Sequence, residues 1–410
     1  MRLPTVLTVL LMVTACSAAP ADRASRVPAT ARSNLTPGKP TPAVETSPLP
    51  GGTRSGRWRQ TSVNHGRHST TISDLTVLAD GTAYAIGEFG TYGEPGELLL
   101  QRGEGGIWRQ EAAPRVRVEY DSLISGTSAD DLWIVHHGES GPVRAFHRAG
   151  GAWSATVLGN TIGDFYPLDL DVVAPGKAWS VGCSTRADSL SECPSTVVEF
   201  HGGTWRRHSV PITARSLTGH GPSHVWAVGY DPSTKQPAAA SFDGATWTRA
   251  RLPRLPRPTG RRVRDWRASL VDVLSTGDGL LAVGYTTWLD VGPDGREDGE
   301  EDEGDDQYVF RSLVMRLSAG RWSHHLSPHG PMGDELELAP AGQGDAWVAN
   351  GTPSLWRLSG TRWVRHLNLQ DTSIEAIASW PGTSTAWAAT VTETFRDGSP
   401  HRHSAYWRID

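Results

Sequence analysis

The sequence predicts an all-β protein, a seven-bladed β-propeller with four-stranded antiparallel blades closed by an N-terminal outer strand. Two series of aromatic residues carry this prediction. In the first, a glycine-containing turn leads to a tryptophan, at Trp58, Trp108, Trp153, Trp205, Trp247, Trp322 and Trp363. In the second, a strand-like segment such as WAVG carries Tyr84, Trp133, Trp179, Trp226, Leu281, Trp347 and Trp387 at matched positions. Short strands repeated in this way are typical of radial β-architecture.

The repeat unit is clearest in residues 215–249. An inner strand (RSLTG) is followed by a turn, a second strand (HVWAVGY), a variable loop, a third strand (AAASF), a tight turn (DGA) and an outer strand (TWTRA). One such sheet cannot bury both of its faces alone, so neighbouring blades must pack face to face. We therefore expect the repeated tryptophans to be core residues before they are ligand platforms.

The two ends of the repeat region predict how the ring closes. The segment GRWRQT (56–61) has the pattern of an outer strand with no inner strands before it. The chain finishes at HSAYWRID (403–410), which has the pattern of a third strand with no fourth strand after it. Together they complete one blade and remove an open sheet edge. An open solenoid is the alternative, and it would need capping repeats at both ends.

The first residues resemble a bacterial lipoprotein signal. Arg2 precedes a short apolar stretch, and Val13, Thr14 and Ala15 stand before Cys16. The resemblance implies lipidation of Cys16, a signal peptide over 1–16 and a location on the extracytoplasmic face of the cell membrane. An ordinary secretory peptide cleaved near Ala18 or Ala19 is the alternative.

A tether and a single domain are expected after the signal. Residues 17–54 are rich in Pro, Ala, Ser and Thr with few large apolar side chains, so we expect a disordered tether. The propeller is expected over 55–410. No second hydrophobic segment follows, so contact with the membrane is expected through the N-terminal lipid alone.

Two further cysteines, Cys183 and Cys193, lie in one predicted surface loop. In an exported protein such a pair is expected to form a disulfide. A zinc site would need four ligands, and no histidine lies between the two cysteines at ligand spacing.

Two segments of opposite charge interrupt the fifth repeat. Residues 249–267 carry eight arginines and one aspartate, net +7, and residues 290–306 carry ten acids and one arginine, net −9. Both are expected on the face of the propeller that carries the longest loops, with 286–307 as a long insertion. We predict a binding surface here, formed by Arg261, Arg262, Arg264, Trp288, Asp290 and Asp294.

The acidic segment has two other interpretations. It could be a solvated loop that partly neutralises its basic neighbour. It could also bind calcium, since it offers many carboxylates, but the ligand spacing of a calcium-binding loop is not met. We expect no other cofactor or metal. Nucleic acid is not expected as a partner, because prolines interrupt the arginines and the chain is mildly acidic overall.

The turns 200–205 (HGGTW after Phe200) and 241–247 (SFDGATW) resemble shortened aspartate boxes of sialidase-like propellers. The WAVG and FDGATW patterns also resemble kelch-like or galactose-oxidase-like propellers and exported bacterial proteins built of such repeats. A sialidase site would require an arginine triad with a tyrosine and a glutamate, which cannot be placed on this sequence. No nucleophile elbow, phosphate loop or metalloprotease helix is present, so no catalytic residue is assigned.

The sequence thus favours a monomeric binding or scaffolding module at the cell envelope, with a protein or carbohydrate ligand. The alternative is a carbohydrate-active hydrolase or lyase with its site at the mouth of the central channel. A third possibility is a protein partner steered by charge to residues 249–306. Acids expected on inner strands discriminate the first two: two that converge with raised pKa values favour the enzyme. They are Asp74, Asp121, Asp169, Asp272, Glu335, Glu337 and Glu375.

Overall fold

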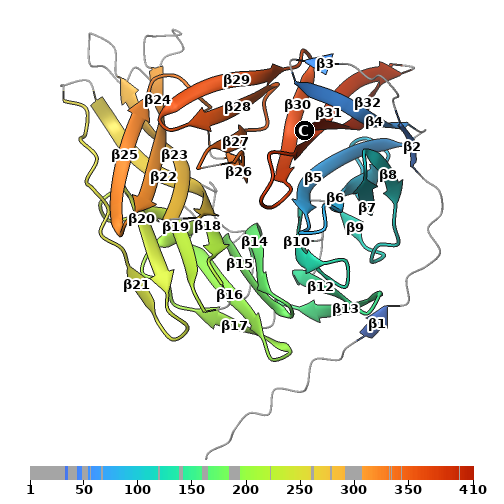
Figure 1. Cartoon of the computed structure of the whole chain (residues 1–410), viewed down its shortest axis with the longest axis horizontal. Helices are drawn as coiled ribbons and strands as arrows, with labels where there is room; N and C mark the ends of the chain where they lie inside the picture. Colours follow the sequence, from blue (N-terminus) through green and yellow to red (C-terminus); the bar gives the residue numbers. More distant parts are fainter. Residues whose placement is uncertain are drawn as a thin grey trace, which may run out of the picture. The chain divides into compact units, whose positions relative to one another are not determined.

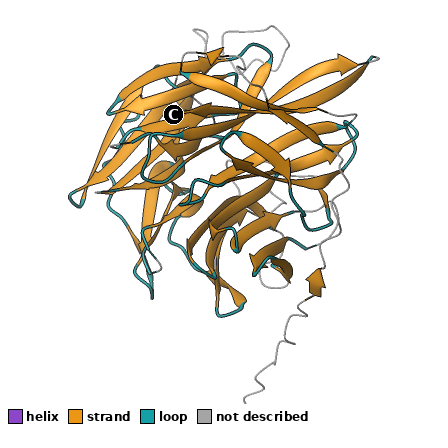
Figure 2. Cartoon of the chain, turned by 45° about the vertical axis from the view of Figure 1, so that its right-hand side comes forward, coloured by secondary structure: helices purple, strands orange, loops and turns teal. Residues whose placement is uncertain are grey.

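The computed structural model describes residues 33–35, 44–48, 54–55, 57–65 and 68–410, except 119–120, 138–141, 159–164, 184–193, 222, 260–262, 278, 291–306, 332, 334, 343 and 397. Met1–Ala31 and Arg32–Asp410 form separate units. The described part is all strand and loop (Figure 2). None of its segments is a helix long and apolar enough to cross a membrane.

Seven antiparallel sheets follow one another around a ring, as Figure 1 shows. Blades 1 to 3 comprise β5 (Ser69–Val77), β6 (Ala83–Gly90), β7 (Gly96–Glu104), β8 (Ile107–Gln110); β10 (Ser122–Ser128), β11 (Asp131–His136), β12 (Arg144–Ala149), β13 (Ala152–Val157); and β14 (Tyr166–Ala174), β15 (Lys177–Cys183), β16 (Ser195–His201), β17 (Thr204–His208). Blades 4 to 6 comprise β18 (Thr213–Gly219), β19 (Val225–Asp231), β20 (Gln236–Phe242), β21 (Trp247–Arg249); β22 (Val263–Thr276), β23 (Gly279–Asp290), β24 (Gln307–Ser318), β25 (Arg321–Ser327); and β26 (Glu337–Pro340), β27 (Ala346–Ala349), β28 (Ser354–Ser359), β29 (Arg362–Asn368).

Blade 7 confirms the predicted ring closure. Its three inner strands, β30 (Thr372–Ser379), β31 (Ala386–Arg396) and β32 (Ser399–Ile409), come from the C-terminus, and its outer strand, β4 (Trp58–His65), comes from the N-terminal side. β4 runs antiparallel to β32, with Val63 opposite Ala405 and Arg59 opposite Arg408. The seven-bladed propeller with an N-terminal closing strand is therefore the fold of this chain.

Short strands also occupy part of the segment predicted to be a disordered tether. β1 (Ser33–Leu35) pairs with β13, β2 (Glu45–Pro48) pairs with β4, and β3 (Arg54–Ser55) pairs with β4. At these residues the structure differs from the prediction, because outer strands of a propeller leave unpaired edges that a passing chain can join even without large apolar side chains. The boundaries 17–54 and 55–410 otherwise stay predictions.

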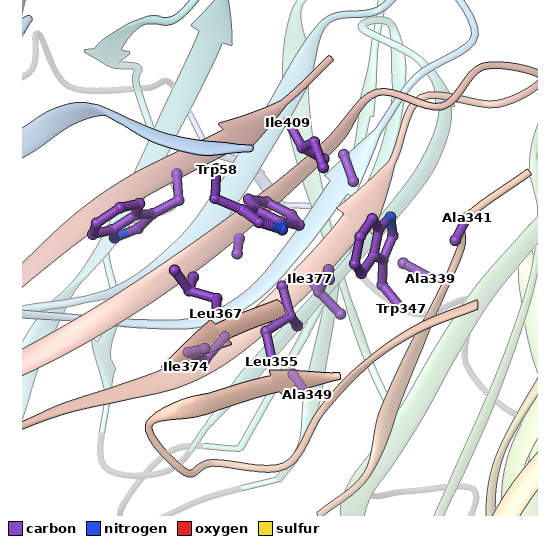
Figure 3. Close-up of a cluster of buried hydrophobic side chains, with 13 residues drawn as sticks. Trp58, Ala339, Ala341, Trp347, Ala349, Leu355, Leu367, Ile374, Ile377 and Ile409 are labelled. Carbon is purple, nitrogen blue, oxygen red and sulfur yellow. The ribbon is translucent and has the colours of Figure 1, made fainter. Parts of the chain in front are cut away.

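The two tryptophan series meet at the blade interfaces. In five of them the tryptophan of one outer strand packs edge-on against the second-strand tryptophan of the preceding blade, with ring centroids 5.3–5.9 Å apart. Such T-shaped packing suits the charge distribution of aromatic rings. The pairs are Trp58–Trp347 (Figure 3), Trp108–Trp387, Trp205–Trp133, Trp247–Trp179 and Trp322–Trp226.

The other two interfaces follow the same plan with a different partner. Trp153 shares a buried cluster with Tyr84, and Trp363 packs against the cluster that contains Leu281. Ten of the fourteen series residues are buried, and Trp226, Trp247, Trp322 and Trp363 are half-buried. The prediction that these residues form the core is confirmed at the buried positions.

In blades 1, 2, 3 and 5 the two-residue turn before the outer strand explains the glycines of the first series. Gly105 and Gly106, which join β7 to β8, both have positive φ, 57° and 94°. A two-residue turn of this hand matches the twist of the strands it joins and favours glycine at both positions. In blade 5 Ala319 takes the first position of the corresponding turn, before Gly320. Its φ of 47° is an uncommon conformation for a residue with a side chain.

Blade 5 differs from the prediction at its charged segments. The insertion expected over 286–307 is strand at both ends, because β23 continues to Asp290 and β24 begins at Gln307. The connector expected over 249–267 is strand from Val263 onward. Hydrogen bonding along the hairpin satisfies backbone groups that a loop would leave to water, which lengthens these strands.

Candidate functional site

Six of the seven acids expected on inner strands fall into two groups, and Glu335, which is exposed, belongs to neither. In the first group each carboxylate accepts a hydrogen bond from a backbone N–H of the next blade's inner strand, and we call these four residues the clamp carboxylates. The bonds are Ile124 N to Asp74 (2.7 Å), Leu217 N to Asp169 (2.8 Å), Leu338 N to Asp272 (2.6 Å) and Ile377 N to Glu337 (3.2 Å). A register shift precedes the three aspartates, and such a bulge can re-aim a side chain towards a neighbouring strand.

Burial, reinforced by the charges of their neighbours, raises the pKa values of the clamp carboxylates. Burial, with the nearby charges of Asp169 and Asp272, raises the pKa of Asp74 to about 7. Burial and the charge of Asp169 raise the pKa of Asp272 to about 7, and the pKa of Glu337 lies well above its usual range, chiefly because of burial.

One hydroxyl group shows why a proton must be retained here. Ser216 Oγ lies 2.8 Å from Asp169 Oδ2 and 2.7 Å from Asp272 Oδ1. A hydroxyl has one proton to donate, so the second of these contacts requires a protonated carboxyl as the donor. The clamp carboxylates therefore tie adjacent blades together and are engaged structurally, which leaves the remaining acids as candidates for chemistry.

The second group, Asp121 and Glu375, lines a cavity of about 490 Å³, which we call the mouth pocket. It lies where inner strands begin and second strands end, on the face predicted to carry the long loops. Five carboxylates from blades 7, 1 and 2 line it, together with one arginine: Glu88, Asp121, Asp371, Glu375, Glu393 and Arg402. Thr71, Ser73 and Ser373 add hydroxyl groups.

Three of these carboxylates hold their protons more tightly than usual. Burial raises the pKa of Glu88 and of Glu375, and each is raised further by the charge of Asp121. Asp121 keeps an exposed surface at the mouth, yet the protein around it removes enough water to raise its pKa as well. All three line one cavity, and the charge of Asp121 raises the pKa values of the other two, so a single positive group could enter the cavity favourably.

Arg402 and Tyr92 form a wall beside the mouth pocket: Arg402 lines the mouth pocket, and both residues line a smaller cavity next to it. Arg402 Nε donates to Glu393 Oε2 at 3.2 Å, and the guanidinium lies 5.0 Å from the centre of the Tyr92 ring. The Tyr92 hydroxyl donates to the same carboxylate oxygen at 3.3 Å. The smaller cavity of about 30 Å³ adjoins this wall, lined by Tyr92, Glu88 and Gly93 among others. The wall thus combines an aromatic ring with hydrogen-bonding groups.

The predicted binding residues of blade 5 are not part of the mouth pocket. Arg264 and Asp290 are exposed near the ends of β22 and β23, and Trp288 is only 7% exposed, with Arg311 5.4 Å from its ring centre. The indole of Trp288 is thus engaged in packing. Arg261, Arg262 and Asp294 lie outside the described residues, as does the proposed calcium loop apart from Asp290. Binding at these residues stays a prediction.

The cysteine predictions also fall largely outside the described residues. Cys16 and Cys193 are not among them, and Cys183 is buried at the end of β15. The disulfide and the lipid modification therefore stay predictions. Within the described ranges no group of three or more His, Cys, Asp or Glu side chains is arranged to hold a metal ion.

Sequence reasoning identified Asp121 and Glu375 but missed Glu88, Asp371, Glu393 and Arg402. Glu88 begins the segment EFGTYGEPGE, which stands out as an elaboration of the first repeat. Glu393 and Arg402 lie on the extended β31–β32 hairpin, opposite each other in register. The signal for Glu88, Glu393 and Arg402 would have been a charged residue at the loop-bearing end of a second or third strand, whereas Asp371 lies in the loop just before an inner strand.

No family model and no curated protein matches the chain. Among solved structures it is similar to an alpha-L-arabinofuranosidase from Fusarium graminearum, at 10% identity and TM-score 0.43, over 83% of this chain and 97% of that one. It is also similar to the Aleuria aurantia lectin (12%, TM-score 0.41, 73% and 96%) and to the Neurospora crassa Pan2 WD40 domain (10%, TM-score 0.49, 88% and 98%). At such identities these similarities concern the fold alone.

Proposed function

We propose that the propeller is a binding module whose mouth pocket takes a positively charged, hydroxyl-bearing ligand, such as an amino sugar of an envelope polymer. The convergence of five carboxylates and one arginine on a cavity of about 490 Å³ carries this proposal. The volume lies within the range of about 300–1,000 Å³ that is usual for small-molecule sites.

The chemistry of the wall supports a sugar with an amino group. Carboxylates accept hydrogen bonds from hydroxyl and ammonium groups, and charge-assisted bonds are about twice as strong as neutral ones. An ammonium group would also relieve the repulsion among Glu88, Asp121 and Glu375. Tyr92, 37% exposed, adds an aromatic ring next to Glu393, to which its hydroxyl donates.

Hydrolysis of a glycosidic bond is the second candidate function, and Asp121 and Glu375 meet the condition stated above for an enzyme, because they line one pocket and both have raised pKa values. It is favoured by the raised pKa values of Glu88, Asp121 and Glu375 in a water-accessible pocket, since a glycosidase needs one protonated carboxyl as a general acid beside a second carboxyl group. The similarity to kelch-like, galactose-oxidase-like or sialidase-like repeats remains an expectation from the sequence and adds nothing to this choice.

Calorimetric titration with glucosamine oligomers and with their N-acetylated forms tests the binding proposal. We expect the amino forms to bind, and Asp121→Asn or Glu375→Gln to weaken them about tenfold or more, because a lost hydrogen bond to a charged group costs about 1.5–3 kcal/mol. Asp130→Asn, in the exposed turn between β10 and β11, is the matched control and should bind normally.

Two results would decide against binding of a cationic sugar. Equal affinity for the amino and N-acetylated oligomers, or unchanged affinity in both pocket variants, would contradict it. Release of reducing ends from the oligomers, lost in Glu375→Gln and retained in Asp130→Asn, would instead support hydrolysis.

Anchoring at the cell membrane through Cys16 is a further part of the proposal, supported by the resemblance of residues 1–16 to a lipoprotein signal. We expect Cys16→Ser to move the protein from the membrane fraction to the soluble extracytoplasmic fraction. Wild-type levels in the membrane fraction for that variant would rule out lipid anchoring.

A further inference from the structure

A proline-rich segment crosses the outer side of blade 4 between β21 and β22. We call residues 249–259, with the sequence RARLPRLPRPT, the arginine strap. Pro253, Pro256 and Pro258 have φ fixed near −65°, and each restrains the residue before it to extended conformations. The backbone from 252 to 258 therefore favours extended conformations, among them polyproline II, which has three residues per turn.

Exposure along the strap repeats every three residues, as a polyproline II helix requires. Arg251, Arg254 and Arg257 are exposed, whereas Leu255 is buried and the residues three before and three after it, Leu252 and Pro258, are half-buried. At a rise of about 3.1 Å per residue, successive arginines lie about 9 Å apart along one edge. The strap therefore presents a row of guanidinium groups with a regular spacing.

Contacts with blades 4 and 5 hold the strap in place. Gln236, which is buried at the start of β20, accepts a hydrogen bond from Leu255 N at 2.9 Å and donates one to Leu255 O at 3.2 Å. Arg257 donates to Thr234 O at 3.0 Å, and its guanidinium lies 5.2 Å from the ring centre of Trp266. A segment restrained in this way loses little further conformational entropy when a ligand binds.

A cavity of about 460 Å³ lies between the strap and β20. Arg249, Arg251 and Arg254 line it, and Pro237, Ala238, Leu252 and Pro253 supply apolar surface. The single carboxylate there, Asp231, forms an ion pair with Arg249 at 2.5 Å. Burial alone would raise the pKa of Asp231, but hydrogen bonds from Ser233 and Arg249 outweigh burial and lower this pKa. Arg251 and Arg254 have no hydrogen-bond or ion-pair partner in the described parts of the chain.

We propose that the arginine strap docks an extended acidic peptide segment of a partner protein, with carboxylates on Arg251 and Arg254 and an apolar side chain in the cavity between them. The guanidinium fork matches a carboxylate in two-point geometry. A peptide in the polyproline II conformation with an acidic residue at every third position has the same repeat of about 9 Å as the strap.

The apolar part of the cavity favours a peptide over a phosphate polymer. A purely ionic partner would gain nothing from Pro237, Ala238 and Leu252, whereas a leucine or proline between two acidic residues would bury apolar surface there. This surface is formed by blade 4 and the strap, and the mouth pocket by blades 7, 1 and 2. Each proposal can therefore fail without the other.

Fluorescence anisotropy with the full chain and labelled synthetic peptides of about twelve residues tests the docking proposal. The probes are repeats of Glu-Leu-Pro, with Gln-Leu-Pro and Glu-Ala-Pro repeats as comparisons. We expect Arg251→Gln and Arg254→Gln each to weaken the Glu-Leu-Pro peptide about two- to fivefold and the double variant about tenfold, since exposed ion pairs contribute up to about 1 kcal/mol.

The controls separate docking from general charge attraction. Arg206→Gln/Arg207→Gln, an exposed pair on β17, removes the same charge and should leave the affinity unchanged. The Gln-Leu-Pro repeat should bind far more weakly than Glu-Leu-Pro, and Glu-Ala-Pro should bind less tightly. Equal affinity of the strap double variant and the wild type would overturn the proposal. So would equal affinity for Glu-Leu-Pro, Glu-Ala-Pro and inorganic polyphosphate, which would indicate a non-specific polyanion surface.

Discussion

Substitution of Trp58 by alanine is expected to lower the free energy of unfolding by about 3–5 kcal/mol. Trp58 is fully buried, and its ring packs edge-on against Trp347 with centroids 5.3 Å apart (Figure 3). It lies on β4, the strand that completes blade 7, so the cavity left behind would weaken both the interface with blade 6 and the closure of the ring. Urea unfolding followed by tryptophan fluorescence measures the change.

Trp322→Ala is the matched control for this prediction. Trp322 takes the same position in blade 5 and packs against Trp226 at 5.9 Å, but it is half-buried and lies in a blade formed by continuous chain. We expect it to cost clearly less than Trp58→Ala. A loss below about 1 kcal/mol for Trp58→Ala, which is within the range of ordinary substitutions, would show that β4 contributes little to closure.

The second large effect expected is a fall in the free energy of unfolding as the pH rises from about 4 to above 7. The clamp carboxylates have raised pKa values in the folded protein, about 7 for Asp74 and Asp272, so folding favours their protonated forms. Their contribution is fully present below the unfolded value of about 4 and is lost as the pH rises through the folded value. Thermal unfolding across this range measures it.

Asp272→Asn isolates the contribution of the clamp carboxylates. Asparagine keeps the size of the neutral acid and one acceptor oxygen, so the variant should lose less stability than the wild type between pH 4 and 8. His136 acts in the opposite sense, because burial lowers its pKa to about 4, but it is common to both proteins. Asp130→Asn is the surface control. Parallel pH profiles for Asp272→Asn and the wild type would refute the clamp interpretation.

Local patterns in the sequence were sufficient to predict the architecture. The glycine turn before each outer strand, the WAVG-like second strand and the incomplete repeats at 56–61 and 403–410 each depend on neighbours close along the chain. Because a propeller repeats one supersecondary unit, these short-range signals predicted the blade count and the partner of β4.

Contacts between blades were decided only by the tertiary structure. The sequence shows two tryptophan series, but the ring brings Trp58 against Trp347, which lies far along the chain. The same applies to the acids: Asp74 and Glu375 have similar sequence surroundings, yet Asp74 reaches the next blade's backbone and Glu375 faces the mouth pocket.

The physical reason is that periodicity specifies which face of a strand is buried, whereas the role of a polar side chain depends on groups from other blades. Spacing along the chain could not predict that the Gln236 side chain would hydrogen-bond the backbone of Leu255. Nor could it predict that the Ser216 hydroxyl would contact two carboxylates from different blades. Hydrogen bonds and carboxylate pKa values respond to a few ångströms of separation, and only closure of the ring determines those separations.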